Sequence, residues 1–241
     1  MPGSVEAEAV VLRSIRYGEA DRVLHLYTPD RGRVGAIAKG VRRTKSRFGG
    51  RLEPFSRVNL QLHEGRSDLM TVTGADTIEP HARLREDARS LDAAARACDA
   101  VARLFETGDP HPAVYHLLCH ELALLDAAPD RYATLGNQLA FRLKLLLAAG
   151  LAPHLAECAN CGECDHLAGF SGAAGGVVCS ACEASAFPLG EDAHTFMTEA
   201  LGRSLADTPA ADDRALRQAE RAIRETAEHH AHVRLRAAIA G

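Results

Sequence analysis

The chain has 241 residues, of which 46% are hydrophobic and 25% charged, and a formal net charge of −4, which is typical of a globular protein. No apolar run reaches the roughly 18 residues of a membrane-spanning helix, and the N-terminus lacks the basic and apolar segments of a secretory signal peptide. These features argue against a membrane protein or an exported one, so we expect a cytoplasmic location and no membrane partner.

Positive charge is concentrated in one stretch of the chain. Residues 31–66 hold ten basic and two acidic side chains, a net charge of +8, whereas residues 67–157 carry a net charge of −5 and residues 183–241 a net charge of −3. One face of the folded protein can therefore attract phosphate even though the whole chain is acidic.

The N-terminal third predicts five short β-strands, because it carries apolar runs and period-two alternation. The segments are Ala9–Leu12, Arg22–Tyr27, Val34–Ala38, Val58–His63 and Leu69–Thr77. Short strands in this number must pair or close their edges, and a small antiparallel barrel does so. Between the third and fourth strands, the polar segment 41–50 is expected to be a mobile basic loop.

From residue 80 onward the apolar spacing becomes helical. Ser90 is the expected N-cap of a first helix, and Pro112 is expected to open a second. A third helix is expected from about Tyr132 to Ala149, and two more near residues 193–206 and 213–238.

The predicted fold class is therefore α+β, with a five-stranded barrel over residues 1–79. An all-helical domain follows over residues 80–152 and resumes over residues 189–241. A cysteine-rich module over residues 153–188 interrupts it, and we expect the later helices to complete the same bundle.

Two Cys-x-x-Cys pairs, Cys158/Cys161 and Cys179/Cys182, are separated by seventeen residues. Each pair places two thiolates on one tight turn, and the segment between them is long enough to bring the turns together around a tetrahedral Zn²⁺. Four thiolates leave no open coordination position, so a structural zinc ion is favoured over a catalytic one. Five of the seven cysteines lie within 25 residues, and this clustering favours a metal over disulfides in a cytosolic protein.

The ligand set and the metal leave alternatives open. Cys164 can replace Cys158, because the pair Cys161/Cys164 leaves a feasible insert of fourteen residues before Cys179. Gly162 favours the set with Cys158, since a tight turn there lets backbone N–H groups face sulfur. An iron–sulfur cluster and a group of reduced, buried cysteines are the remaining interpretations.

The basic stretch predicts a nucleic-acid surface, with a solvated basic loop as the alternative interpretation. Aromatic residues are interleaved with the cations, and cationic grooves with stacking rings bind single strands without reading their sequence. Phe48 is the favoured stacking residue because it lies in the polar loop. The residues expected to contact DNA are Arg31, Arg33, Lys39, Arg42, Arg43, Lys45, Arg47, Phe48, Arg51 and Arg57.

Sequence patterns of common enzyme sites are missing. The chain has no phosphate-binding Gly-x-x-x-x-Gly-Lys-Ser/Thr motif, and none of its twelve histidines is followed two positions later by Glu, as a zinc deaminase requires. We therefore expect a binding protein rather than an enzyme. A metal-bearing scaffold that binds only proteins and a metal-dependent hydrolase are the rival classes.

In several segments the sequence resembles the bacterial RecO family of recombination and DNA-repair proteins, and the resemblance covers essentially the whole chain. The segments that carry it are Tyr17-Gly-Glu-Ala-Asp-Arg22, Thr28-x-x-x-Gly32, Ala38-Lys-Gly-Val-Arg42, Leu52-Glu-Pro-Phe55, Cys158-x-x-Cys161-Gly162, Phe170, Gly175-Gly176 and Cys179-x-x-Cys182. Some members of the family lack the cysteines, which fits a structural role for zinc.

The resemblance implies an N-terminal OB-fold, a helical domain and an embedded zinc module. It also implies binding of single- and double-stranded DNA, annealing of complementary strands, and work with RecR to help load RecA onto strands coated by single-strand-binding protein. The acidic C-terminal tail of that protein is expected to dock on the helical domain. Arg131, Arg142 and Lys144 are candidates for this docking site.

Overall fold

The structure is a computed structural model that describes residues 3–43, 46, 48, 50–65, 68–105 and 110–238. The chain divides into two compact units, residues 1–129 and residues 130–241. The first holds a barrel and two helices and the second holds further helices and a small sheet, which confirms the α+β class. No helix in the described ranges is long and apolar enough to cross a membrane. The finer division at residues 79, 152 and 188 stays a prediction.

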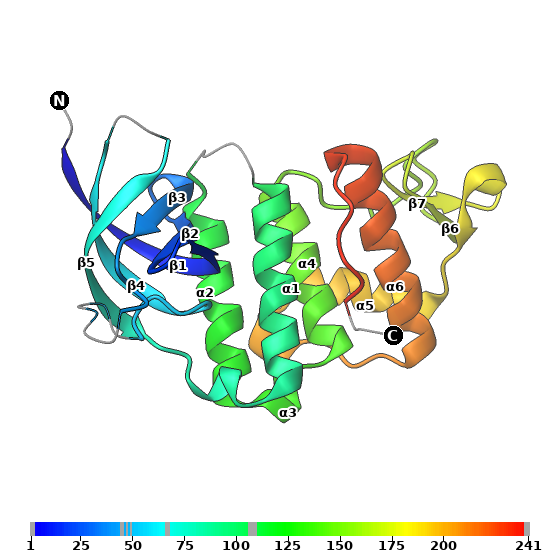
Figure 1. The fold of residues 1–241 in the computed structure, drawn as a ribbon. Coiled ribbons are helices and arrows are strands. Elements are labelled where there is room, and N and C mark those ends of the chain that lie inside the picture. The colour runs from blue at the N-terminus through cyan, green and yellow to red at the C-terminus, as the bar shows by residue number, and fades with distance from the viewer. Residues whose placement is uncertain are drawn as a thin grey trace. The chain divides into compact units, whose positions relative to one another are not determined.

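The first five strands form a closed barrel in the order β1-β2-β3-β5-β4 (Figure 1). Their bounds are β1 Ser4–Tyr17, β2 Asp21–Thr28, β3 Gly32–Ala38, β4 Arg57–His63 and β5 Met70–Glu79. β3 and β5 pair in parallel and the other neighbours are antiparallel, which corrects the expectation of a fully antiparallel barrel. β4 pairs with β1 on one side and with β5 on the other. β5 therefore lies between β4 and β3, and it runs in the same direction as β3. This is the strand arrangement of an OB-fold.

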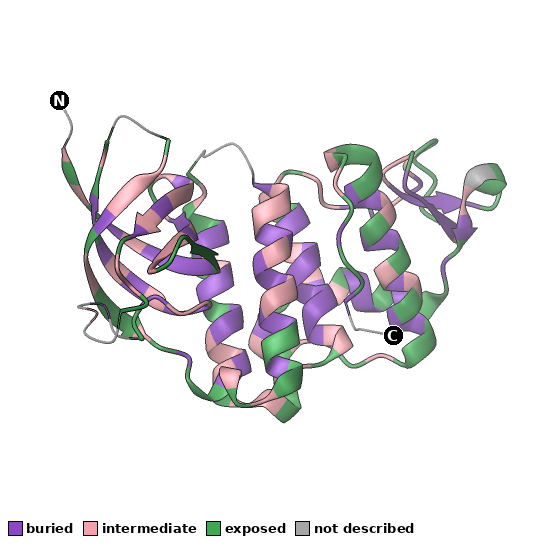
Figure 2. Cartoon of the chain, viewed as in Figure 1, coloured by how far each residue is buried: buried purple, intermediate pink, exposed green. Residues whose placement is uncertain are grey.

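Buried and more exposed residues follow one another along the barrel strands (Figure 2), because successive side chains of a strand point to opposite faces. The inner side chains are apolar and buried: Ala7, Ala9, Val11, Leu24, Leu26, Ala36, Ala38, Val58, Leu60, Leu62 and Val72. Val10 is also buried although it lies on the other face of β1, because the helices of the first unit cover this part of the strand. The continuous apolar run 9–12 therefore marks a strand that is buried on both faces.

A β-bulge in β1 decides which of its side chains reach solvent. The register of β1 against β2 shifts between Val11 and Arg13. Before the shift, odd-numbered residues such as Val11 point into the barrel. After it, Arg13, Ile15 and Tyr17 lie on the outer face, because each is directly opposite an outward-pointing residue of β2. Ile15 is 38% exposed and Tyr17 is 58% exposed.

Two helices complete the first unit, α1 at Ala88–Leu104 and α2 at Pro112–Ala127. Pro112 opens α2, as predicted. The N-cap of α1 is Asp87 and not Ser90, because a carboxylate oxygen of Asp87 accepts the backbone N–H of Ser90 at 2.8 Å. Ser90 is instead buried, and its hydroxyl donates to the carbonyl of Leu125 at 3.2 Å, which ties α1 to α2.

The third expected helix is divided in two, α3 at Pro129–Tyr132 and α4 at Leu135–Ala148. Thr134 separates them because its backbone is extended and its hydroxyl oxygen accepts the backbone N–H of Asn137, as an N-cap does. Gly150 ends this region with a φ of +72°, in the left-handed conformation that favours glycine.

Helix α5 spans Glu191–Gly202 and α6 spans Asp213–Thr226, followed by one wider helical turn at Ala227–Ala231. The expected helix to residue 238 is therefore too long. His232 adopts a left-handed φ of 55°, which ends the helix, and the chain continues without regular structure. Helices α4, α5 and α6 pack against one another within the second unit, whereas α1 and α2 belong to the first. That one bundle spans residues 80–152 and 189–241 stays a prediction.

The cysteine module lies between α4 and α5 in sequence and contains a three-stranded sheet in the order β7-β6-β8. Its strands are β6 Leu167–Ser171, β7 Gly176–Cys179 and β8 Phe187–Pro188. The guanidinium carbon of Arg221 on α6 lies 4.1 Å from the ring centroid of Phe187, so a cation–π contact attaches the sheet to the helices of the second unit.

Candidate functional site

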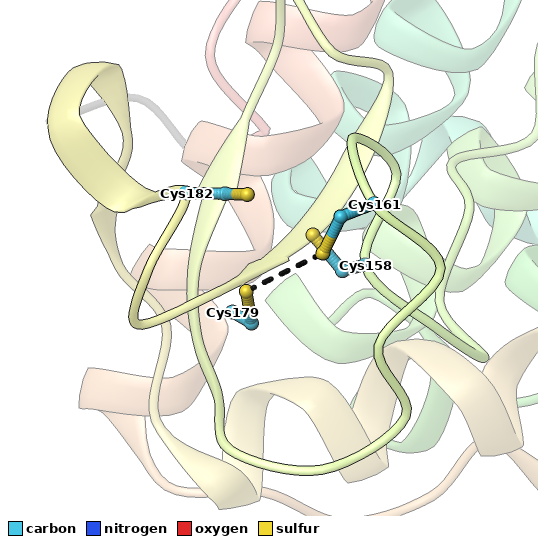
Figure 3. Close-up of side chains that lie close together, drawn as sticks. All are labelled: Cys158, Cys161, Cys179 and Cys182. Carbon is cyan, nitrogen blue, oxygen red and sulfur yellow. Dashed lines mark hydrogen bonds between the residues drawn. The ribbon is translucent and has the colours of Figure 1, made fainter.

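The thiols of Cys158, Cys161, Cys179 and Cys182 face one another across two turns (Figure 3). Their sulfur atoms all lie within 4.8 Å of one another, and those of Cys161 and Cys179 are 3.7 Å apart. Four sulfurs around Zn²⁺, each about 2.3 Å from it, lie about 3.8 Å apart at the tetrahedral angle. The four cysteines are therefore close enough to hold a metal ion.

The two turns are shaped by their own backbone hydrogen bonds. The N–H of Gly162 donates to the carbonyl of Cys158 at 2.9 Å, and the N–H of Cys182 donates to the carbonyl of Cys179 at the same distance. Gly162 has a φ of +77°, which side chains disfavour. The sequence signal at Gly162 thus reports a tight turn, although its own N–H bonds a carbonyl rather than a sulfur.

Cys158 and Cys182 differ in how easily their thiols ionise. Backbone hydrogen bonds, first that of Cys179 and then those of Asn160 and Cys161, lower the pKa of the Cys158 thiol to about 6. Hydrogen bonds with the sulfurs of Cys161 and Cys179 raise the pKa of Cys182 to about 12. Four thiolates in so small a space repel one another unless a cation lies between them, so this donor set suits a bound metal ion.

Cys164 lies outside the cluster. Its side chain is exposed, and its sulfur is 3.9 Å from the carbonyl oxygen of Gly162. Cys158 is only 2% exposed and belongs to the small core of the module. The fold therefore brings Cys158, and not Cys164, to the other three cysteines.

At one end of the barrel, the turn after β1 meets the segment after β3. The guanidinium of Arg42 donates to the carbonyl of Glu19 at 3.0 Å, and its backbone N–H donates to the carbonyl of Ala20 at 2.9 Å. The backbone N–H of Gly40 donates to a carboxylate oxygen of Asp21 at 2.7 Å. Two segments about twenty residues apart in sequence are thus held together as one rim.

Four exposed cations lie at this junction, and we call them the cationic rim: Arg16, Lys39, Arg42 and Arg43. Glu19, in the same turn, is an exposed acidic residue. Within the part of the chain that the structure describes, none of the four cations forms an ion pair. Their charges are therefore available to a partner outside the protein.

Three other predicted DNA contacts are engaged inside the first unit. Arg31 pairs with Glu64 at 2.6 Å, and the guanidinium of Arg33 donates to the carbonyl of Ala102 on α1 at 2.8 Å. Arg57 pairs with two carboxylates at the contact between the barrel and α2. These cations lie on the barrel as expected, but internal partners hold them.

The prediction that Phe48 stacks on bases is wrong, because its ring is 1% exposed and packs with Leu52 in the barrel core. Phe48 and Leu52, which come between β3 and β4 in sequence, thus fill part of the barrel core. Arg51 is exposed, and its guanidinium lies 3.4 Å from the carbonyl oxygen of Phe48. Lys45 and Arg47 lie outside the described residues.

Sequence reasoning missed two exposed cations of β1, because Arg13 and Arg16 precede the stretch of highest charge. Burial, and then the charges of Arg33 and Arg13, lower the pKa of His25 on β2. Both guanidinium groups are therefore close enough to His25, on the outer face of β2, to disfavour its protonation. The bulge in β1 could not be read from the sequence, so the outward orientation of Arg13 and Tyr17 was not expected.

Comparison with known proteins covers both units of the chain. Residues 1–81 match the family described as "Recombination protein O N terminal", and residues 85–238 match "Recombination protein O C terminal". The chain is 40% identical over 228 residues to the DNA repair protein RecO of Rubrobacter xylanophilus, which covers 93% of this chain and 89% of that protein. The chain belongs to the RecO family.

Two other relatives agree with this assignment. The chain is 44% identical over 179 residues to the DNA repair protein RecO of Bifidobacterium adolescentis, covering 72% of each chain. It is 41% identical over 180 residues to the DNA repair protein RecO of a Nocardioides species, covering 73% of this chain and 72% of that one. Membership of the RecO family places the protein in DNA repair and recombination.

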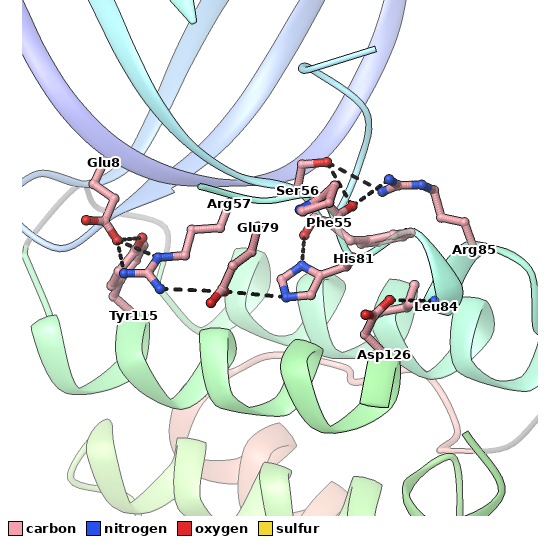
Figure 4. Close-up of polar contacts among 11 residues, drawn as sticks. Glu8, Phe55, Ser56, Arg57, Glu79, His81, Leu84, Arg85, Tyr115 and Asp126 are labelled. Carbon is pink, nitrogen blue, oxygen red and sulfur yellow. Dashed lines mark hydrogen bonds and ion pairs between the residues drawn. The ribbon is translucent and has the colours of Figure 1, made fainter. Parts of the chain in front are cut away.

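In this RecO-family protein a polar network attaches the barrel to α2 (Figure 4). The guanidinium of Arg57 donates to a carboxylate oxygen of Glu8 at 2.6 Å, and the hydroxyl of Tyr115 donates to the same oxygen at 2.7 Å. Arg57 also lies 3.5 Å from a carboxylate oxygen of Glu79. Burial alone would raise the pKa of Glu8, but the hydrogen bonds from Tyr115 and Arg57 outweigh it and lower the pKa.

In the second unit of this RecO-family protein, the three candidate residues for docking of the acidic tail differ in exposure. Arg142 is 4% exposed, and Lys144 donates to the carbonyl of Leu201 at 3.2 Å while burial lowers its pKa. Both lie within the helical packing. Arg131 is exposed, its guanidinium carbon is 5.2 Å from the ring centroid of Tyr132, and both line a cavity of about 470 Å³. Of the three, Arg131 is the one that is exposed, whereas Lys144 is only partly exposed.

Proposed function

We propose that this protein is a DNA repair and recombination mediator that binds single- and double-stranded DNA and anneals complementary strands. With RecR, it helps load RecA onto strands coated by single-strand-binding protein, and it acts in the cytoplasm at the nucleoid. The observation that carries the proposal is the cationic rim, where two hydrogen-bonded segments hold four exposed, unpaired cations at one end of an OB-fold. This fold binds oligonucleotides on strands β2 and β3 and on the loop after β1.

The proposed mechanism involves no bond chemistry. Two complementary strands repel each other through their phosphates, and cations at the rim offset that repulsion while the strands approach. Lys39, Arg42 and Arg43 supply this charge, and we propose that Lys45 and Arg47, in the same segment of sequence, add to it. Hydrogen bonds of Arg42 to the turn after β1 fix part of this charge in place before DNA arrives.

We propose that the metal held by the cysteine cluster is Zn²⁺ and that its role is structural. Four thiolates saturate a tetrahedral ion, so no coordination position is left to activate water. Cys158 and Cys161 from one turn would be joined to Cys179 and Cys182 from the other, and bound zinc would supply the attraction that holds the two turns together. A hydrolase that uses this metal is therefore disfavoured.

For the acidic tail of single-strand-binding protein, we propose the cavity beside Arg131. The cavity is lined by apolar side chains such as Leu135 and Leu216. The positively charged Arg131 also lines it. An acidic peptide with an apolar end has matching chemistry, because the guanidinium can pair with carboxylates while apolar side chains are buried. Asp207 and Asp213 also line the cavity, so Arg131 must supply the attraction for a negatively charged tail.

Reversing the charges of Arg42 and Arg43 to Glu tests the proposed DNA surface. We expect affinity for single- and double-stranded oligonucleotides to fall by at least about 10-fold at low salt, because attraction to the phosphates becomes repulsion. The rate of annealing should fall as well. For a single strand, the slope of log affinity against log salt should decrease by about 0.7 for each phosphate that the protein no longer neutralises.

The matched control is reversal of Arg214 and Arg217, two exposed arginines of α6, which changes the net charge equally. We expect this variant to bind DNA within about twofold of the wild type. Equal losses in both variants would mean that only the total charge matters, and unchanged binding in the Arg42/Arg43 variant would reject the rim. A protein that binds no oligonucleotide at any salt concentration would instead be the scaffold alternative, without direct DNA contact.

A further inference from the structure

We infer that Tyr17, supported by Ile15, is the side chain on which the protein stacks unpaired bases, and that it sets the preference for single-stranded over double-stranded DNA. The inference rests on the proposed DNA binding at the cationic rim and adds to it a residue that distinguishes the two forms of DNA.

The aromatic residues of the barrel differ sharply in exposure. Four Tyr and Phe residues lie between positions 3 and 79, and the structure describes all of them. Tyr27, Phe48 and Phe55 are between 0% and 7% exposed, and Tyr27 packs edge-on against Phe105 near α1. Tyr17 is 58% exposed. It is therefore the one Tyr or Phe ring of the described barrel that can meet a base.

The β-bulge gives Tyr17 an apolar neighbour. After the bulge, Ile15 and Tyr17 share the outer face of β1, and Ile15 is 38% exposed. The residue directly opposite Ile15 on β2 is Val23, which is also apolar and partly exposed. A ring beside two aliphatic side chains forms a flat apolar surface, and exposing it to water is unfavourable unless a partner covers it.

The same hydrogen bonds that build the cationic rim fix the position of Tyr17. The residue directly opposite Tyr17 is Asp21, whose carboxylate accepts the backbone N–H of Gly40 at 2.7 Å. Gly18 follows Tyr17 with a φ of +56°, which turns the chain sharply toward β2. The backbone at Tyr17 is thus held beside the cations, and little ordering is required when a strand binds.

This placement separates two kinds of contact. Cations bind phosphates of both single and double strands, because each phosphate carries a negative charge in either form. A ring can stack only on a base whose face is free, and in a duplex the neighbouring base pairs cover those faces. Arg42 and Arg43 therefore provide affinity for either form, whereas Tyr17 contributes to single strands alone.

The test uses Tyr17→Ala and Tyr17→Phe in the full-length protein, with single-stranded and duplex oligonucleotides of equal length. We expect Tyr17→Ala to lower single-strand affinity by roughly 5- to 150-fold, the range for loss of one base–aromatic stack, and to change duplex affinity by less than about twofold. Tyr17→Phe should retain single-strand affinity, since the ring is kept. The salt slope of Tyr17→Ala should equal that of the wild type, because no charge is removed.

A spectroscopic measurement tests stacking directly. The chain contains no Trp, so Tyr17→Trp introduces a single tryptophan, whose emission can be excited separately from that of the remaining tyrosines. Its emission should be quenched by a single strand and not by a duplex. Leu91→Ala, which removes another exposed apolar side chain of the first unit, is the matched control and should leave both affinities unchanged.

Equal losses for single strands and duplexes in Tyr17→Ala, or no loss at all, would overturn the inference, as would emission that the two forms of DNA quench equally. If either result accompanies weakened binding in the Arg42/Arg43 variant, the DNA surface stands and Tyr17 is not its stacking residue. If the Arg42/Arg43 variant binds normally while Tyr17→Ala loses only single-strand affinity, the stacking residue stands and the proposed cationic contacts are wrong.

Discussion

The cysteine cluster and the cationic rim each bring like charges together, but the cluster is partly buried and the rim is exposed to water. Two of the four cluster cysteines, Cys158 and Cys179, are 2% and 3% exposed, and thiolates so close together require a cation between them. The cations of the rim are exposed, and water screens them from one another. Charge that is enclosed by the protein must be neutralised from within, whereas charge on the surface can be left for a partner.

The same distinction applies among the arginines of the barrel. Arg57 forms ion pairs with two carboxylates at the contact with α2, and Arg31 forms one with Glu64. Each of these arginines therefore neutralises acidic side chains of the protein itself. Arg43 has an exposed side chain in no ion pair among the described residues. A count of basic residues in the sequence treats all of these alike, but only the exposed and unpaired ones can neutralise phosphate without breaking an internal contact.

The largest expected effect is that of Cys179→Ser. We expect loss of bound metal and a fall of about 5 kcal/mol or more in the stability of the cysteine module, because the cluster loses a ligand that is almost fully buried. DNA affinity of the barrel should change by less than about twofold if the cluster and the rim are independent. Metal analysis, thermal unfolding and oligonucleotide titration check these outcomes.

Cys164→Ser is the matched control, since Cys164 lies in the same module and is exposed. It should keep its metal and its melting temperature. Metal retained in Cys179→Ser would show that Cys179 is not a ligand, and metal lost in Cys164→Ser would show that Cys164 is one.

A smaller effect is expected for Phe48→Ala, at the boundary between barrel core and rim. Removing a ring that is 1% exposed should lower the free energy of unfolding by about 3–5 kcal/mol. Phe48→Leu should recover most of that loss. In both variants, the folded protein should bind single strands as the wild type does, as measured by titration below the unfolding transition. A loss of single-strand affinity at unchanged stability would restore Phe48 as a stacking residue.

The smallest expected effect is on pH dependence, through Glu8→Gln. The hydrogen bonds from Tyr115 and Arg57 lower the pKa of Glu8 in the folded state. Glu8 therefore stabilises the fold above its ordinary pKa of about 4.5, and this contribution is lost as pH falls through the lowered folded value. At pH 7 the variant should be less stable by about 1 kcal/mol, and the difference should shrink below pH 4.5.

Urea unfolding between pH 7 and pH 3 measures this difference. Glu64→Gln is the control, because its ion pair with Arg31 is about 40% exposed on both sides and should contribute less than about 0.5 kcal/mol. A constant difference between the wild type and Glu8→Gln across this pH range would mean that the ionisation of Glu8 is not linked to folding.

The sequence by itself predicted the features that depend on local pattern. Apolar runs and period-two alternation predicted all five barrel strands, because each strand must bury at least one face. The Cys-x-x-Cys spacing predicted which turns would meet, since a tight turn needs only a few residues and Gly162 supplies its left-handed backbone. Pro112 predicted the start of α2, because its missing N–H costs nothing in a first turn.

Only the tertiary structure decided which side chains reach solvent. Phe48 lies in a polar segment, yet its ring fills the barrel, because closing five strands leaves a space that local sequence does not report. Tyr17 lies at the end of an apolar strand, yet it is exposed, because one extra residue at the bulge reverses the faces of β1. Burial, register and ion pairing depend on residues distant in sequence, so an exposed aromatic and a buried one look alike until the chain is folded.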